Sequence, residues 1–429
     1  MPALLLLLGL LFAALTAISL WPPRRPGSVA FAAWFVCWVH SELPIHLALL
    51  EIGVATGAVV GGALTAWPGW VGLALTAASV IGLARHVRYA NATTETVERG
   101  LAETLGGNYH DRIDPDLRRR YDPSTRLLSL ATVFPFRPAA VERMRDLPYA
   151  KHGRRTLCLD VYRAVNPALR IGGPGGAPVF LYVHGGAWVI GHKGQQGRIL
   201  AHELAAAGWV VVSINYRLSP GATWPDHIVD VKRAIRWVRE HIAEHGGDPG
   251  FVVIGGGSAG AHLASLAALT PNASEWQRDF PDVDTSVQAC VAFYGVYDFL
   301  DDARIFRHRA FRRLLLERVV MKRRLDDARE EFQKASPIER IAGAGDMPPF
   351  LVIHGDLDCL APLEGARRFR DALRAAQGQV AYVEVPGANH AFELFPSLRS
   401  VPVAHGVHRF CQLVYSNHVA GRPRRDAAG

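Results

Sequence analysis

The 429-residue sequence has few cysteines, and the five that it has form no pattern. They are odd in number and widely scattered, which does not resemble a disulfide framework. No Cys-x-x-Cys pair and no close cluster of cysteine and histidine indicates a metal site. The sequence therefore predicts neither a disulfide-stabilised domain nor a metal centre. The cysteines are Cys37, Cys158, Cys290, Cys359 and Cys411.

Charged residues are almost absent from residues 1–90, which contain long apolar runs instead. Spanning the hydrocarbon core of a bilayer takes about 20 apolar residues, and polar residues interrupt a further run at 29–39 before a span is complete. The first run lacks the basic start and the cleavage site of a secretory signal peptide. We expect about three transmembrane spans, with two or four spans, or buried core helices of a soluble protein, as alternatives. The three runs are Leu4 to Leu20, Ile45 to Trp67 and Trp70 to Ala84.

Arginines that flank these runs predict the orientation of the chain. Arg24 and Arg25 follow the first run, whereas Arg85 and Arg88 follow the last. Short flanking segments rich in Lys and Arg stay on the cytoplasmic side, and two spans between the clusters place both on that side. We thus expect a multi-pass membrane protein whose large C-terminal domain faces the cytoplasm. Four spans would reverse this orientation.

The net charge of +8 does not by itself indicate a nucleic-acid partner. The basic excess lies near the membrane segment and in residues 304–324, which suits an anionic lipid surface or solvated helix faces. No nucleic-acid motif is present in the sequence. Membrane lipids are therefore expected as partners and nucleic acid is not, while the oligomeric state is not predicted.

Short apolar runs of strand character alternate with helix-like segments in residues 146–418. This alternation predicts an α/β fold, a mostly parallel sheet with helices on both faces. Residues 296–335 are helix-rich and contain no strand, so we expect a lid over the strand ends, with an ordinary surface helix pair as the alternative. Residues 91–145 are expected to be a connector with some helix, and 419–429 a flexible tail. The runs are 179–183, 209–215, 251–254, 287–293, 350–354 and 380–385.

The motif Gly256-Gly257-Ser258-Ala259-Gly260 lies between an apolar strand and a helix-like stretch. A serine at such a sharp turn needs small neighbours, so that its hydroxyl stands clear above the sheet. We therefore expect Ser258 to be a nucleophile, with a purely structural glycine-rich turn as the alternative.

A serine nucleophile needs a base and an acid that orients the base. His390 follows the apolar run at 380–385, and Asp358 follows the run at 350–354. The order Ser, Asp, His is typical of one class of serine hydrolases. We predict His390 as the base and Asp358 as its acid, with Asp356 as the alternative acid that otherwise braces the loop.

The turn His184-Gly185-Gly186-Ala187-Trp188 follows another apolar run and can supply main-chain donors for an oxyanion. We expect the amides of Gly186 and Ala187 to join that of Ala259 in an oxyanion hole. His184 is expected to hold the loop rather than to transfer protons.

Residues 145–418 resemble the α/β-hydrolase superfamily, and within it the hormone-sensitive-lipase-like esterases. The His-Gly-Gly-x-Trp turn is similar to that of feruloyl-esterase-like and kynurenine-formamidase-like relatives, while His354 to Asp358 resembles the peptidase-like branch. The membrane segment ahead of this domain resembles membrane-attached carboxylesterases of actinobacteria. The matching positions are 184–188, 215–220, 246–249, 257–260, 336–337, 358 and 390.

The expected function is a membrane-anchored serine carboxylesterase that acts on small-molecule or lipid esters and needs neither a metal nor an organic cofactor. Amide hydrolysis and acyl transfer with the same three residues are the alternatives, followed by a non-catalytic binding protein. Four aromatic side chains are candidates to line an apolar pocket, with simple packing in the core as the more common alternative. These are Trp188, Phe299, Phe306 and Phe311.

Overall fold

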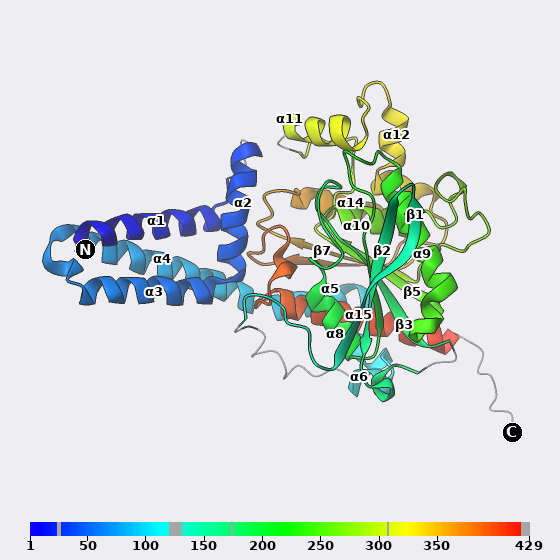
Figure 1. Cartoon of the computed structure of the whole chain (residues 1–429), viewed down its shortest axis with the longest axis horizontal. Helices are drawn as coiled ribbons and strands as arrows, with labels where there is room; N and C mark the ends of the chain where they lie inside the picture. Colours follow the sequence, from blue (N-terminus) through cyan, green and yellow to red (C-terminus); the bar gives the residue numbers. More distant parts are fainter. Residues whose placement is uncertain (24–26, 120–129, 131, 173–174, 307–308, 422–429) are drawn as a thin grey trace.

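The structure is a computed structural model that describes residues 1–23, 27–119, 130, 132–172, 175–306 and 309–421. A helical bundle extends from one side of an α/β domain, and the N-terminus lies at the end of the bundle far from that domain (Figure 1). Arg24, Arg25 and most of the tail expected at 419–429 lie outside the described residues.

The α/β domain is built on one eight-stranded sheet with the strand order β1-β2-β4-β3-β5-β6-β7-β8. Strands β3 to β8 are parallel, whereas β1 and β2 pair antiparallel with each other and β2 pairs antiparallel with β4. The mostly parallel sheet expected from the sequence is confirmed, and all six expected runs are strands. The bounds are β1 Val141–His152, β2 Arg155–Ala164, β3 Ala177–Val183, β4 Val210–Ile214, β5 Gly247–Gly257, β6 Ala289–Phe293, β7 Phe350–Gly355 and β8 Val380–Val385.

Helices cover both faces of the sheet, because both faces of its buried parallel strands are apolar. On one face α9 (Asp226–His241), α10 (Ala259–Leu269) and α14 (Leu363–Ala375) pack in one hydrophobic core. On the other face α5 (Thr93–Leu105), α8 (Arg198–Ala206) and α15 (Ser400–Gly421) pack in a second core. The central strands are thus buried on both sides, and their carboxyl ends are free to carry functional loops.

The antiparallel hairpin β1–β2 was not expected from the sequence, and the boundary expected at 146 falls inside β1. Within the expected connector, residues 93–105 form the helix α5, which packs on β8, where Thr104 Oγ1 donates to the Val380 carbonyl oxygen at 2.8 Å. A side chain at Gly100 would collide with the Tyr382 carbonyl, so the glycine permits this close approach. A short helix, α6 (Pro115–Arg119), follows α5.

The expected lid segment leaves the sheet after β6 and contains short helical pieces near the top of Figure 1. These are α11 (Arg309–Arg312), a π-helical stretch (Arg313–Val320) and α12 (Arg329–Lys334), followed by α13 (Pro337–Arg340). The segment is therefore helical as expected.

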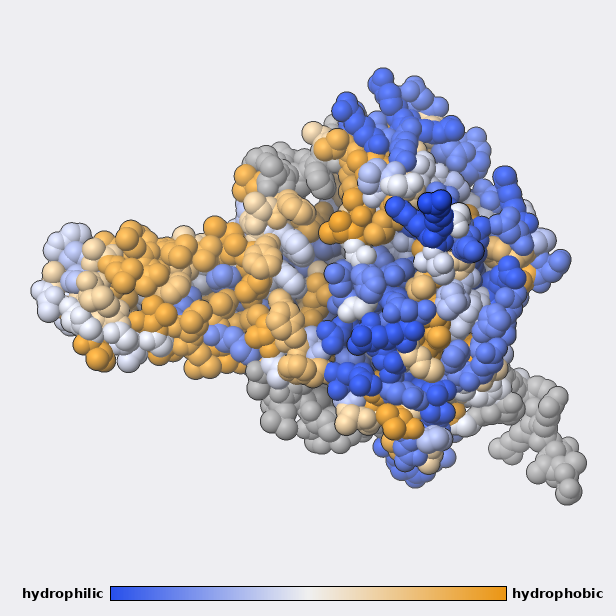
Figure 2. Space-filling model, in the orientation of Figure 1, coloured by the Kyte–Doolittle hydropathy of each residue, from blue (hydrophilic) through white to orange (hydrophobic). Residues whose placement is uncertain are grey.

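The N-terminal bundle consists of three helices side by side and one crosswise helix at their base (Figure 1). Apolar surface gathers on the bundle, whereas the visible face of the α/β domain is largely hydrophilic (Figure 2). Within the described residues, two helical stretches, Pro2–Leu20 and Trp67–Leu105, are long and apolar enough to cross a membrane. A third span is possible if Phe31–Glu42 and Pro44–Val60, which meet at a bend of 90°, count as one. The bundle helices are α1 (Pro2–Leu20), α3 (Pro44–Val60) and α4 (Trp67–Asn91), and the crosswise helix is α2 (Gly27–Glu42).

Candidate active site

Ser258 occupies a strained turn between β5 and α10. Its φ of 56° and ψ of −118° are rare for a residue with a side chain, and such strain often marks functional sites. A Cβ atom at Gly256 or at Gly260 would collide with the Val183 carbonyl of β3. The two flanking glycines therefore let the turn lie directly against the neighbouring strand, as their spacing in the sequence predicts.

His390 bridges Ser258 and Asp358. Its Nε2 atom lies 2.9 Å from Ser258 Oγ, and its Nδ1 atom lies 2.7 Å from Asp358 Oδ2. The three side chains come from the loops after β5, β7 and β8, so the carboxyl ends of the strands bring them together. The structure thus joins the three residues that the sequence predicts as nucleophile, base and acid.

Asp358 is buried and held in its charged form. Its Oδ1 atom accepts hydrogen bonds from the amides of Leu360 and Ala361, both at 2.8 Å. Burial raises the pKa of this carboxyl, but the neighbouring rings of His390 and His354 outweigh burial and hold its pKa well below its usual range. A permanent negative charge therefore faces the Nδ1 atom of His390.

His354 is a member of this cluster that the sequence reasoning did not assign. Its Nε2 atom lies 3.3 Å from Asp358 Oδ2 and 3.0 Å from the Ala361 carbonyl oxygen. Both neighbours are acceptors, so we assign a ring proton to Nε2. The ring thus contacts both Asp358 and Ala361 of this loop. Its position four residues before Asp358 does not by itself indicate this role.

Asp356 is not in contact with His390. Its Oδ1 atom accepts a hydrogen bond of 2.7 Å from the Gly387 amide, which belongs to the loop that leads to His390. The structure therefore gives Asp356 the bracing position and brings Asp358, not Asp356, to the imidazole.

The turn after β3 presents main-chain donors beside Ser258. Gly186, Ala187 and Trp188 have φ values of 116°, 54° and 61°, which fold the chain sharply back. Within the described part of the chain, the amides of Gly186, Ala187 and Ala259 donate no hydrogen bond, whereas the Gly185 amide donates to Gln196 Oε1 at 2.6 Å. A side chain at Gly185 would come within 3.1 Å of Ser258 Cβ, so this turn lies against the serine.

His184 is buried under this turn. Its Nδ1 atom lies 2.7 Å from the Gly185 carbonyl oxygen, and its ring stacks on Tyr216 with centroids 4.5 Å apart. Burial lowers its pKa to about 4, so the ring is neutral at physiological pH. The histidine supports the turn and does not face the other three residues.

The aromatic residues expected to line a pocket divide into two groups. Trp188 and Phe299 are buried, and their rings meet edge to face with centroids 5.1 Å apart. Phe306, in contrast, lines a groove beside the Asp358 loop together with Leu360. The side chain of Phe311 lies outside the described residues. Among the residues that the structure describes, no group of three or more His, Cys, Asp or Glu side chains is arranged to hold a metal ion.

Similarity to known proteins extends over nearly the whole chain. A family model described as BD-FAE matches residues 168–373. A probable carboxylic ester hydrolase of Mycobacterium tuberculosis, LipM, is 39% identical over 95% of this chain and 93% of its own length. The chain belongs to the hormone-sensitive-lipase-like and feruloyl-esterase-like α/β-hydrolases. It is a serine-type ester hydrolase, and this confirms the resemblance seen in its motifs.

Two further relatives agree with this placement. Esterase LipQ of Mycobacterium tuberculosis is 40% identical over 78% of this chain and 77% of its own length. A butyrate-bound esterase of Thermogutta terrifontis has a TM-score of 0.51 and 25% identity, and the match covers 67% of this chain and 97% of that structure. The match to LipM spans 95% of the chain and therefore reaches into the N-terminal bundle, whereas the match to the solved structure covers about two thirds of the chain.

Proposed function

We propose that this ester hydrolase is a membrane-anchored serine carboxylesterase that works through an acyl-enzyme, with Ser258, His390 and Asp358 as its catalytic residues. The observation that carries the proposal is the continuous line of hydrogen bonds, 2.9 Å and 2.7 Å long, from Ser258 through His390 to Asp358. The named relatives are esterases, which favours ester hydrolysis over the amide hydrolysis and acyl transfer kept as alternatives.

The chemistry follows from this geometry. Ser258 Oγ attacks the ester carbonyl carbon and passes its proton to His390 Nε2, while Asp358 stabilises the imidazolium. The oxyanion that forms would be bound by the amides of Gly186, Ala187 and Ala259. His390 then returns the proton to the alkoxide as the C–O bond breaks, the alcohol leaves, and an acyl-serine remains. Water attacks this acyl group by the same steps in reverse, releasing the acid and restoring the serine.

The bundle is the proposed anchor. Helices α1 and α4 are each long and apolar enough for one pass, and α3, beside them, is the proposed third pass. Their exposed side chains, such as Leu7, Leu49 and Ile81, are apolar. The α/β domain lies at the end where α4 carries Arg85 and Arg88, and this excess of arginine supports a cytoplasmic side for the domain. Resistance of the protein to alkaline carbonate extraction tests the anchor. Reporter fusions at the C-terminus, one active only in the cytoplasm and one only outside it, test the orientation.

The decisive experiment replaces Ser258 by alanine and uses Ser265→Ala as the matched control. Ser265 is a buried serine of α10, the helix that follows Ser258. We expect Ser258→Ala to lower kcat for p-nitrophenyl butyrate by about 10⁵-fold or more and to abolish labelling by a fluorophosphonate. Ser265→Ala should retain labelling and most activity. Activity of Ser258→Ala equal to that of the control would refute the proposed nucleophile.

A further inference from the structure

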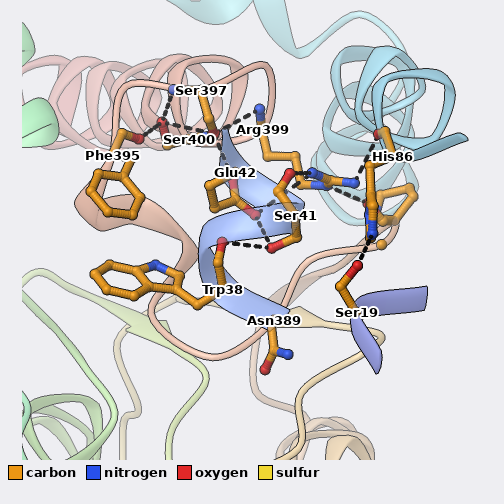
Figure 3. Close-up of polar contacts among 12 residues, drawn as sticks. Ser19, Trp38, Ser41, Glu42, His86, Asn389, Phe395, Ser397, Arg399 and Ser400 are labelled. Carbon is orange, nitrogen blue, oxygen red and sulfur yellow. Dashed lines mark hydrogen bonds and ion pairs between the residues drawn. The ribbon is translucent and has the colours of Figure 1, made fainter. Parts of the chain in front are cut away.

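The crosswise helix α2 lies against the loop that carries His390. This loop, residues 386–400, leaves β8 and ends at the start of α15. Figure 3 shows α2 beside the loop, with polar side chains of both elements joined by hydrogen bonds. The bundle therefore contacts the α/β domain at the element that places the proposed base.

Two tryptophans of α2 donate hydrogen bonds directly to this loop. Trp34 Nε1 lies 3.0 Å from the carbonyl oxygen of His390 itself, and Trp38 Nε1 lies 2.9 Å from the carbonyl oxygen of Ala391. Ala391 has a φ of 63°, a conformation that residues with a side chain rarely adopt. The two indole bonds thus hold a strained stretch of main chain whose first residue is the proposed base.

Further contacts fix α2 in place along the rest of the loop. The Trp38 ring stacks on Phe395 with centroids 4.4 Å apart. At the end of the helix, Ser397 Oγ donates to Glu42 Oε2 at 2.6 Å. Arg399 donates to the Pro386 carbonyl oxygen at 2.7 Å and to the Ser41 carbonyl oxygen, so it ties both ends of the loop to α2 (Figure 3). These contacts thereby join segments that are far apart in the sequence.

The outer side of α2 is aromatic and exposed. Phe31 and Phe35 are 55% and 59% exposed, and their rings adjoin Trp34 and Trp38 with centroids 6.2 Å and 5.9 Å apart. Aromatic side chains on a helix at the base of a membrane bundle are typical of the bilayer interface. The same helix therefore faces lipid on one side and the His390 loop on the other.

We propose that Trp34 and Trp38 are positioning residues for ester hydrolysis, and that α2 is part of the active-site framework as well as of the anchor. Through the carbonyls of residues 390 and 391, the two indoles keep the imidazole in line between Ser258 and Asp358. This inference rests on the proposed catalytic role of those three residues. Neither tryptophan needs to touch the ester.

This role predicts a specific kinetic pattern. A small displacement of a catalytic group can cost about 100-fold in rate, whereas substrate affinity is unaffected by a residue that does not touch substrate. Loss of the indole donors should therefore lower kcat and leave KM unchanged. Loss of fold would instead reduce the number of active molecules and leave the kcat of each remaining molecule unchanged.

The test uses the full chain in detergent and replaces Trp34 and Trp38 by phenylalanine, singly and together. Phenylalanine keeps an aromatic ring and removes only the N–H donor. The matched control is Trp70→Phe, because Trp70 Nε1 donates to the Leu64 carbonyl oxygen at 3.1 Å at the far end of the bundle. The concentration of active sites is counted with a fluorophosphonate, and kcat per titrated site is measured with p-nitrophenyl butyrate.

We expect the double variant to lose about tenfold or more in kcat per titrated site, with KM within about twofold of the unaltered protein. Trp70→Phe should match the unaltered protein in both. Equal kcat per site in the double variant and the control would overturn the inference, and so would a loss of activity explained fully by fewer titrated sites. Failure of the proposed function is a separate result, because Ser258→Ala would then keep its activity.

Discussion

Replacing Asp358 by asparagine probes the proposed acid, because Asp356 offers the same substitution two residues away. Asparagine keeps one carbonyl oxygen, which can still accept the 2.8 Å hydrogen bonds from the amides of Leu360 and Ala361. The loop should therefore keep its structure. The substitution replaces the other oxygen, Asp358 Oδ2, which lies 2.7 Å from His390 Nδ1, by an N–H₂ group.

The expected loss in kcat follows from the tautomer of His390. An amide N–H₂ facing His390 Nδ1 makes that nitrogen the acceptor and places the ring proton on Nε2, which then cannot accept the proton of Ser258. In serine hydrolases this exchange costs about 10⁴-fold in kcat, or about 5 kcal/mol of transition-state stabilisation. Asp356→Asn differs, since its carbonyl can still accept from the Gly387 amide, and burial already raises the pKa of Asp356. We expect it to change kcat by less than about threefold.

The assay is hydrolysis of p-nitrophenyl butyrate by both variants in detergent at neutral pH, with circular dichroism to show that each is folded. A folded Asp358→Asn enzyme with kcat within tenfold of the unaltered protein would refute the proposed role of Asp358. A loss in Asp356→Asn as large as that in Asp358→Asn would show that the two aspartates share the role.

Two further predictions concern stability. A Cβ atom at Gly72 of α4 would lie 2.5 Å from the Leu5 main chain, whereas one at Gly53 of α3 would meet nothing within 4 Å. We therefore expect Gly72→Ala to lower the free energy of unfolding by about 1–3 kcal/mol, and Gly53→Ala to leave it unchanged or raise it. Thermal unfolding of both variants in detergent measures the difference. Burial lowers the pKa of Lys232 to about 7, so below that pH its buried charge destabilises the fold, and the penalty is relieved as pH rises from about 7 towards the unfolded value of about 10.4. In the unaltered protein the free energy of unfolding should therefore rise by up to roughly 5 kcal/mol over this pH range. Lys232→Met should lack this rise, whereas Lys151→Met, at an exposed site, should show it. Parallel profiles of unfolding free energy against pH for the unaltered protein and both variants would contradict this.

The central strands and the turn of Ser258 were predictable because their signals are local. An apolar run followed by small residues specifies a buried strand and a tight turn whatever surrounds it. The β1–β2 hairpin gave no such signal. Its β1 strand contains Pro148 and two irregularities in register, features that an edge strand tolerates and a central one does not. Its pattern is therefore too weak to distinguish from the connector expected at 91–145.

The sequence favoured Asp358 as the acid and left Asp356 as the alternative. Both follow β7, and only the path of the loop decides which carboxylate reaches the imidazole. His354 contacts this loop at two points, 3.0 Å from the Ala361 carbonyl oxygen and 3.3 Å from Asp358 Oδ2, and so supports its path. A single histidine at a strand end carries no local signal for this role.

The place of α2 was the least predictable feature, and the reason lies in the same residues that interrupt its apolar run. His40, Glu42 and Pro44 argue against a membrane span, because charge is costly within the bilayer. In the structure, Glu42 is buried against Ser397 and Arg399, so this residue docks the helix on the His390 loop. The indole bond of Trp34 joins positions 356 residues apart, a separation that no local pattern encodes. A polar interruption beside an aromatic run therefore marks a helix that ends against the α/β domain and contacts the loop of the site.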